Sequence, residues 1–281
     1  MNKITLYPNA KVNLGLHITE KRADGYHNLE TIFLPVSLVD KLKVAIADPS
    51  ASGTTLSMGG SFIVEDNGED NLVVKAYHLL AQDFSLPYMD IRLEKEIPMG
   101  AGLGGGSADC AFMIRALNEL LELQLGYERM EQYATKLGAD CAFFIRNKAM
   151  YATGKGDIFQ SLPTLPLQGH HIVLVNPHIH ITTKTAFSGV VPHPSSIDLR
   201  EAVQAPITDW KNLIKNDFEE SVFRSYPLIK EIKEQLYSMG ASYASMSGSG
   251  STVYGIFPAS ISEEELTTVF PHHFTMCGRC L

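Results

Sequence analysis

The chain has 281 residues, of which 45% are hydrophobic and 19% are charged, and its formal net charge is -8. This length allows one large domain or two ordinary ones, and the acidic balance argues against a protein that grips nucleic acid over a broad face. No run of about 18 uncharged apolar residues occurs, and the N-terminus lacks a basic region followed by an apolar one, so we expect neither a membrane span nor a signal peptide.

Four cysteines are too few, and too unevenly spaced, for a disulfide framework in a chain of this length. This usage favours a reducing cytoplasm as the location. The C-terminal "CGRC" matches the pattern CxxC, but no second pair supplies two more zinc ligands. We therefore expect Cys277 and Cys280 to be ordinary thiols.

Strand signals dominate the first hundred residues. In "AKVNLGLHI" apolar residues alternate with polar ones, which predicts a half-buried strand with Lys11 and Asn13 together on the polar face. The Asp-Gly pair in "ADGYH" predicts a tight turn after it. Further strands are expected over residues 31–39, 41–46, 54–64 and 88–97.

After residue 107 the hydrophobic period changes to that of a helix. Apolar residues from Ala108 to Leu121 recur at spacings of three and four, and Ser107 is placed to cap this helix. A second helix is predicted over residues 127–137, with Gly138 as its C-cap.

The proline-containing segment 161–169 is the best candidate for a domain junction. We therefore expect domains over residues 1–160 and 161–281, with an α+β arrangement in the second. The elements predicted for this second part are a strand at 171–175, several short helices, a helix at 227–239, strands on either side of "SGSGS", a helix near 261–269 and a strand near Phe274.

The stretch "PMGAGLGGGSAD", residues 98–109, places a glycine-rich loop directly before a helix. Glycines let backbone N–H groups approach a ligand, and the start of a helix adds unpaired donors, so phosphate is the expected occupant. A dinucleotide fold is disfavoured because the preceding segment alternates with charge and contains Pro98. The chain also lacks GxxxxGK[ST] and the HRD and DFG motifs of protein kinases.

The glycine loop resembles the phosphate loop of the GHMP kinases, which phosphorylate small molecules. "LGADCAFF" and "SMSGSGSTVYGIF" follow in the order of that family, so the resemblance spans most of the chain. It implies an α+β, two-domain fold: an N-terminal domain like domain 2 of ribosomal protein S5 and a ferredoxin-like C-terminal domain. The block "NAKVNLGLHITEKRADGYHNLETIF" resembles one branch, which phosphorylates the 2-hydroxyl of 4-diphosphocytidyl-2-C-methyl-D-erythritol.

The resemblance implies the following site residues. Asp140 is the proposed base and Lys11 its electrostatic partner; from the residues alone, a plain N-cap aspartate and a solvated edge lysine are alternatives. The ATP-binding residues implied are Pro98, Met99, Gly100, Ala101, Gly102, Leu103, Gly104, Gly105, Gly106, Ser107 and Ala108, with Asn71 and Lys95 on the adenosine side. The substrate-binding residues implied are Asn13, Tyr26, His27, Thr183, Phe187, Gly248, Ser249 and Gly250.

Within this set, Tyr26 and Phe187 are expected to sandwich the cytosine ring and His27 to bond its edge. Two positions depart from the pattern: Asp109 stands where close relatives often have asparagine, and Thr182 where many have proline. For the SGSGS stretch, contact with the substrate diphosphate and a plain hairpin turn stay open as alternatives.

ATP and Mg²⁺ are the expected cofactors, with no dedicated metal ligand, because magnesium is then held mainly by ATP and water. The expected partner is a small molecule carrying a cytidine diphosphate group, without nucleic acid or membrane, and the expected state is a monomer or weak homodimer. Alternatives are another GHMP kinase, of the homoserine or mevalonate type, and a non-catalytic nucleotide- or RNA-binding protein.

Overall fold

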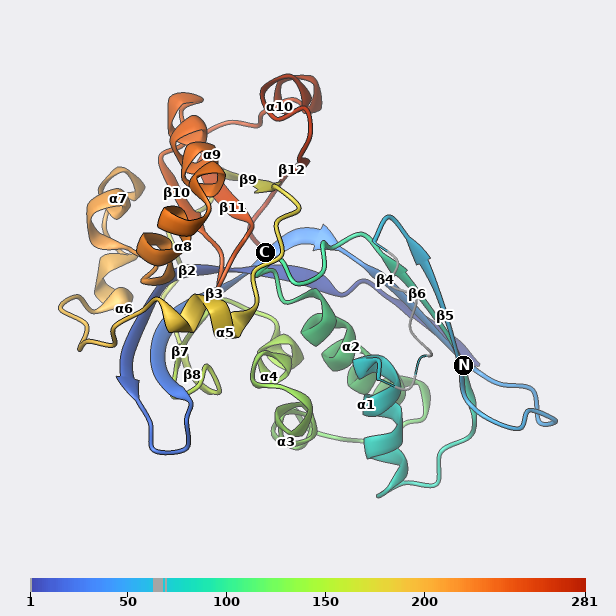
Figure 1. Cartoon of the computed structure of the whole chain (residues 1–281). Coiled ribbons are helices and arrows are strands. Elements are labelled where there is room, and N and C mark those ends of the chain that lie inside the picture. The colour runs from blue at the N-terminus through green and yellow to red at the C-terminus, as the bar shows by residue number, and fades with distance from the viewer. Residues whose placement is uncertain (1, 63–67, 69) are drawn as a thin grey trace. The chain divides into compact units, whose positions relative to one another are not determined.

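The computed structural model of the chain describes residues 2–62, 68 and 70–281 (Figure 1). It contains two compact units, and neither is one continuous stretch of chain. The first unit comprises Met1–Ala10, Leu38–Met99 and Gly104–Asn147, and the second comprises Lys11–Ser37, Gly100–Leu103 and Lys148–Leu281. The glycine loop therefore contributes residues to both units. A domain boundary near residue 160 stays a prediction.

The first unit is built on a four-stranded sheet in the order β1–β4–β6–β5, in which only β5 runs parallel to its neighbour. In Figure 1 helices α1 to α4 gather on one side of this sheet, and α2 packs against β1 and β4. The strands are β1 (Lys3–Leu6), β4 (Lys41–Ile46), β5 (Thr55–Gly60) and β6 (Met89–Lys95); the helices are α1 (Leu72–Ala81), α2 (Gly105–Leu120), α3 (Tyr127–Leu137) and α4 (Ala139–Arg146).

Several predicted elements of this unit are confirmed. β4 and α3 match their predicted ranges, β6 lies within the strand expected over 88–97 but is shorter, and Gly138 is the C-cap of α3. β5 is shorter than the expected strand 54–64, of which residues 63 and 64 lie outside the described residues. The prediction that the first hundred residues are mainly strands missed α1, which buries Val73, Ala76 and Leu80 at helical spacing.

The second unit contains a sheet in the order β2–β3–β7–β8. Its strands are β2 (Asn9–Lys21), β3 (His27–Val39), β7 (Met150–Thr153) and β8 (Ile158–Ser161). The predicted Asp-Gly turn between β2 and β3 is confirmed: the Arg22 N–H donates to the Tyr26 carbonyl at 2.9 Å, and Gly25 has φ +85°. The prediction that β2 is half-buried was wrong, because its residues from Asn9 to Ile18 are buried on both faces.

A second sheet of this unit is antiparallel throughout, in the order β10–β11–β9–β12. α9 packs against β10 and β11, and α10 against β12. The strands are β9 (His171–Asn176), β10 (Tyr243–Met246), β11 (Val253–Phe257) and β12 (Phe274–Gly278); the helices are α5 (Thr183–Ser188), α6 (Leu199–Ala202), η1 (Ile207–Asp209), α7 (Trp210–Leu213), α8 (Phe218–Ser225), α9 (Pro227–Ser238) and α10 (Glu263–Val269). This order confirms the elements predicted after residue 170.

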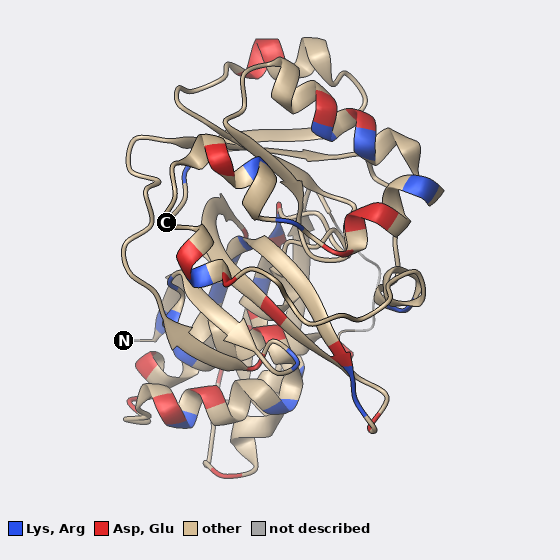
Figure 2. Cartoon of the chain, turned by 90° about the vertical axis from the view of Figure 1, so that its left-hand side faces the viewer, with Lys and Arg blue, Asp and Glu red and all other residues tan. Residues whose placement is uncertain are grey.

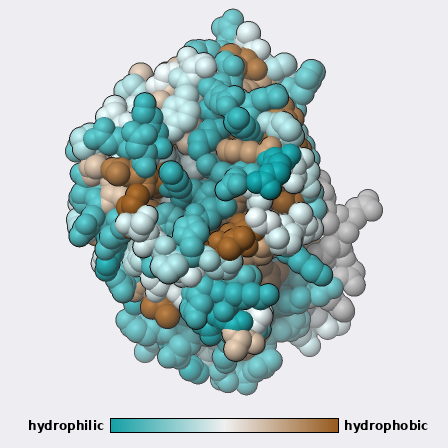
Figure 3. All heavy atoms as spheres, turned by 60° about the vertical axis from the view of Figure 1, so that its left-hand side comes forward, coloured by the Kyte–Doolittle hydropathy of each residue, from teal (hydrophilic) through white to brown (hydrophobic). Residues whose placement is uncertain are grey.

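Side chains of different character are mixed on the surface. Acidic and basic residues are interspersed along the same helices on the side shown in Figure 2. On the face in Figure 3, hydrophobic residues form small patches separated by hydrophilic ones. Among the described residues, no helix combines the length and the apolar character that a membrane crossing requires.

Candidate active site

The start of α2 offers an uncapped set of backbone donors. Its N-cap is Gly104, in the left-handed conformation with φ +72°, and no side chain caps the helix. The prediction that Ser107 caps α2 was wrong, because the helix already begins at Gly105 and Ser107 lies in its first turn. The first N–H groups of a helix lack intrahelical partners and favour an anion, so this geometry fits phosphate.

The earlier part of the glycine loop, Gly100–Leu103, is held by backbone contacts within the second unit. The Gly102 carbonyl accepts from the Ser247 hydroxyl at 2.7 Å and from the Lys11 Nζ at 3.3 Å. A Cβ at Gly102 would lie 2.1 Å from the Ser247 backbone oxygen. Any residue other than glycine would therefore displace one of the two backbones.

Lys11 and Asn13 are buried on β2, with exposed fractions of 4% and 2%. The Lys11 ammonium donates to the Asn13 Oδ1 at 2.7 Å, and the Asn13 amide donates to the Thr31 hydroxyl at 3.0 Å. Lys11 also lies 5.1 Å from the ring centroid of Phe33. The alternative of a solvated edge lysine is excluded by this burial.

Asp140 lies in the first turn of α4, two residues after the N-cap Gly138. It is therefore not a plain N-cap aspartate. Its position in the chain places it at the N-terminal, positive end of the helix dipole. The neighbouring Cys141 thiol is hydrogen-bonded to the Ser107 hydroxyl, so the first turns of α4 and α2 meet within the first unit.

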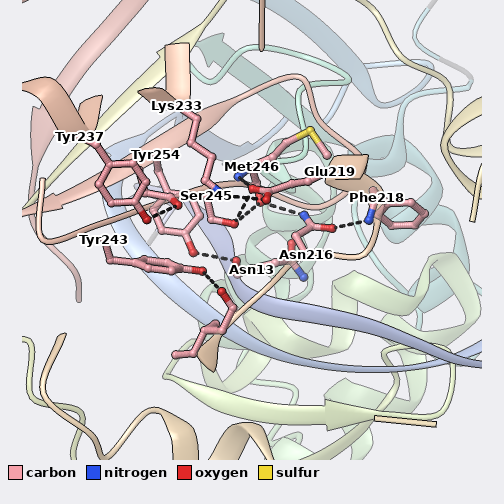
Figure 4. A network of polar contacts seen from close by, with 12 residues as sticks. Asn13, Asn216, Phe218, Glu219, Lys233, Tyr237, Tyr243, Ser245, Met246 and Tyr254 are labelled. Atoms are coloured by element: carbon pink, nitrogen blue, oxygen red, sulfur yellow. Dashed lines mark hydrogen bonds and ion pairs between the residues drawn. The ribbon is translucent and has the colours of Figure 1, made fainter. Parts of the chain in front are cut away.

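A polar network holds the SGSGS turn, residues 247–251, which connects β10 to β11 (Figure 4). The Asn216 amide donates to the carbonyls of Met246 and Gly248, at 2.8 Å each. The Glu219 carboxylate accepts from the Met246 N–H at 2.8 Å and from the Lys233 ammonium at 2.6 Å. The turn is therefore a hairpin connection with a fixed backbone. Asn216 and Glu219 were not among the site residues predicted from the sequence.

The same network reaches the residues of β2. The Tyr254 hydroxyl donates to the Asn13 carbonyl at 2.9 Å, and the Asn13 N–H donates to the Ser247 hydroxyl at 3.3 Å (Figure 4). Strand β2 and the SGSGS turn are therefore joined by direct hydrogen bonds. Within the second unit, the structure brings together Lys11, Asn13, Gly102 and the turn.

The residues expected at the cytosine ring lie on the β2–β3 hairpin and on α5. His27 stacks on Phe187, with 4.6 Å between ring centroids and an interplanar angle of 16°. Tyr26 is 61% exposed, and the Lys155 Nζ lies 4.8 Å from its ring centroid. Thr183 begins α5, and Thr182 is its N-cap, which explains why threonine suits position 182.

Two family models match the chain: the N-terminal domain of GHMP kinases over residues 71–148, and the C-terminal domain of GHMP kinases over residues 199–271. The chain belongs to the GHMP kinase family. The predicted two-domain fold of that family is confirmed. The chain is therefore an ATP-dependent small-molecule kinase.

Two relatives of this GHMP kinase, from different bacteria, carry the same name. A protein of Bacteroides fragilis named 4-diphosphocytidyl-2-C-methyl-D-erythritol kinase is 52% identical over 96% of this chain and 97% of its own. A relative of the same name in Chlorobium phaeobacteroides is 40% identical over 98% and 96% of the two chains.

Two solved structures are also similar. A crystal structure of 4-(cytidine 5'-diphospho)-2C-methyl-D-erythritol kinase has a TM-score of 0.81 at 28% identity, covering 99% of each chain. The homoserine kinase of Cytophaga hutchinsonii, at 16% identity and a TM-score of 0.74 over 100% of this chain and 95% of its own, shows the shared fold.

The two residues expected at the adenosine side of this GHMP kinase have structural partners. Asn71 is the N-cap of α1, and its side chain accepts from the Val73 N–H at 3.0 Å. Lys95 is buried, and its ammonium bonds to the carboxylates of Asp40 and Asp109. The nucleotide contacts of both residues stay predictions.

In the described ranges, no three or more His, Cys, Asp or Glu side chains are grouped so as to hold a metal ion. Cys277 lies in β12 and Cys280 forms an isolated bridge with Val36.

Proposed function

We propose that this kinase transfers the γ-phosphoryl group of ATP to the 2-hydroxyl of 4-diphosphocytidyl-2-C-methyl-D-erythritol, in isoprenoid precursor synthesis. The observation that carries the proposal is 52% identity over 96% of the chain to a relative named for that reaction. The N-terminal block with Tyr26 and His27, which resembles this branch of the family, supports it from the sequence.

For Asp140 we propose the role of base. Phosphoryl transfer to an alcohol needs a group that accepts or orients the hydroxyl proton. Asp140 supplies a carboxylate in the first turn of α4, and a carboxylate is one of the groups that can take this role. For Lys11 we propose an electrostatic role: a buried ammonium lowers the pKa of a nearby alcohol and offsets charge on the transferring group.

The glycine loop would hold the ATP phosphates, and the bare backbone around Gly104 and Gly105 fits that group. Its N–H donors come from the uncapped start of α2, with the Ser107 hydroxyl beside them. Mg²⁺, when bound with ATP, neutralises phosphate charge. The residues of the chain contribute orientation and hydrogen bonds, because few side chains are needed when the metal is held by ATP and water.

For the substrate we propose recognition through its base and its diphosphate. Tyr26, His27 and Phe187 would bind the cytosine ring by stacking and by hydrogen bonds to its edge. The hydrogen-bonded SGSGS turn would present backbone donors to the diphosphate, and Asn13 and Thr183 would contact the diphosphate or the erythritol end. We also propose a monomer or weak homodimer that works in the cytoplasm without nucleic-acid or membrane partners.

Two alternatives are weaker. A homoserine or mevalonate kinase shares the fold, but the homoserine kinase of Cytophaga hutchinsonii is only 16% identical to this chain. A non-catalytic RNA-binding protein requires a basic face, whereas the net charge is -8 and the charges in Figure 2 are mixed.

The test is ADP release by the purified protein with ATP, Mg²⁺ and the cytidylyl substrate, compared with homoserine, mevalonate and no acceptor. We expect release only with the cytidylyl substrate, and a loss of about two to four orders of magnitude in turnover for Asp140→Ala. Asp90→Asn, which changes an exposed carboxylate on β6, is the matched control. Release with homoserine or mevalonate alone would overturn the proposal.

A further inference from the structure

Three buried charged residues meet beside the glycine loop in the first unit. The Lys95 ammonium bonds to the carboxylate of Asp40 and, at 2.6 Å, to the Oδ2 of Asp109. The three side chains have exposed fractions of 3%, 0% and 4%. Buried charges of this kind persist only when they are paired, so the three positions are mutually constrained.

Each member of the cluster is attached to one end of the loop. The Asp40 Oδ1 accepts from the N–H groups of Glu96 and Ile97, at 2.6 and 2.9 Å, directly before the loop begins at Pro98. Asp109 lies on α2, which begins where the loop ends. Lys95 bonds to both carboxylates, so these contacts link the segment before the loop to the helix after it.

We propose that Asp40, Lys95 and Asp109 are positioning residues that hold the two ends of the ATP loop together, and that Asp109 makes nucleotide binding depend on pH. This inference rests on the proposed function, because it assumes that the loop binds ATP. The three residues are called the brace below.

The environment of Asp109 supports the pH dependence. Burial raises its pKa to about 7, and Asp40 adds to this, while Lys95 lowers it. The Asp109 Oδ1 is buried and has no hydrogen-bond partner in the described structure, so only the bond from Lys95 to the other oxygen offsets the cost of burying this carboxylate there.

The charged and titratable groups around Asp109 are few. Among the described residues, the charged groups that face it from other elements are Lys95 on β6 and Asp40 before β4. On its own helix the adjacent Cys110 thiol has a raised pKa, through its hydrogen bond with Cys141 and through burial, and stays neutral.

The charge of the brace therefore changes near neutral pH. Below pH 7, with Asp109 protonated, one ammonium faces one carboxylate and the net charge is zero. Above pH 7 the net charge is -1, directly behind the first turn of the helix that receives the polyphosphate. Repulsion between like charges then weakens nucleotide binding.

The experiment measures the dissociation constant of the Mg²⁺ complex of AMP-PNP at pH 6 and pH 8. Wild type is compared with Asp109→Asn, which keeps an oxygen acceptor for Lys95 but cannot ionise, and with the exposed control Asp90→Asn. Titration of the nucleotide itself is common to all three proteins. Between the two pH values we expect the dissociation constant of wild type to rise about three- to tenfold more than that of Asp109→Asn. Asp90→Asn should follow wild type.

An equal pH dependence in wild type and Asp109→Asn would overturn the role of Asp109. Hydrogen exchange tests the holding role separately: Lys95→Met must speed amide exchange in residues 98–107, and unchanged exchange in a folded variant would overturn it. If the protein binds the nucleotide but phosphorylates no acceptor, the proposed function is refuted. The pH dependence of binding in wild type and Asp109→Asn then still tests the role of the brace. A chain that binds no nucleotide refutes both.

Discussion

Replacing Gly102 with alanine should destabilise the protein, because two constraints coincide at this position. Gly102 has φ +77°, and an added Cβ would lie 2.1 Å from the Ser247 backbone oxygen. A left-handed backbone costs an L-residue about 1–2 kcal/mol, and overpacking against a fixed neighbour typically costs about 1–3 kcal/mol. We expect the free energy of unfolding to fall by about 3 kcal/mol.

The neighbour cannot easily move away. Ser247 donates its hydroxyl to the Gly102 carbonyl at 2.7 Å, and its own N–H donates to the Thr252 carbonyl at 2.9 Å. Displacing the Ser247 backbone would disturb both hydrogen bonds. Relaxation should therefore recover little of the loss.

The assay is urea unfolding followed by circular dichroism, with Gly106→Ala as the matched control. Gly106 is in the same loop, but its nearest neighbour, Leu72 Cδ1, is 4.0 Å from the added Cβ and the residue is helical. Alanine there should be neutral or stabilising by up to about 1 kcal/mol. If Gly102→Ala unfolds at the same urea concentration as Gly106→Ala, the packing argument is refuted.

Two further predictions concern carboxylates that are buried or partly buried. Glu219→Gln should lower the free energy of unfolding by about 1–3 kcal/mol, because Lys233 then loses its charged partner. Glu220→Gln removes a carboxylate from an exposed ion pair and should change the free energy of unfolding little. Urea unfolding of both variants checks the prediction. The pKa of Asp109 is raised from 3.8 to about 7 on folding, so its stabilising contribution is complete below 3.8 and is lost as pH rises through 7. From pH 6 to pH 8 wild type should lose about 1.4 kcal/mol relative to Asp109→Asn in thermal unfolding, and identical losses would contradict this.

Elements with a strong local signal could be predicted from the sequence. α3 and its C-cap Gly138 follow from helical spacing and a glycine stop. The β2–β3 turn follows from an Asp-Gly pair between alternating segments. α1 was missed, although Val73, Ala76 and Leu80 have helical spacing, because short apolar runs are ambiguous between strand and helix.

Features that depend on tertiary contacts could not be predicted. The burial of Lys11 and Asn13 depends on what covers both faces of β2, and alternation alone indicated an exposed polar face. The brace joins residues 40, 95 and 109, which β4–β6 pairing and the packing of α2 bring together. The one sequence signal noted was Asp109, at a position where the family resemblance leads to asparagine as the more usual residue. No local pattern indicated that Asn216 and Glu219 support the SGSGS turn.

Glycine is required in the loop for two different physical reasons, a left-handed backbone at one position and a close backbone contact at another. Gly104 is glycine because the N-cap of α2 is left-handed, which leaves the helix start open to an anion. Gly102 is glycine because the SGSGS backbone touches it. Only the first reason concerns phosphate. If the loop holds ATP as proposed, a substitution at Gly102 should act on ATP binding through stability and loop position, whereas one at Gly104 should act on the backbone donors themselves.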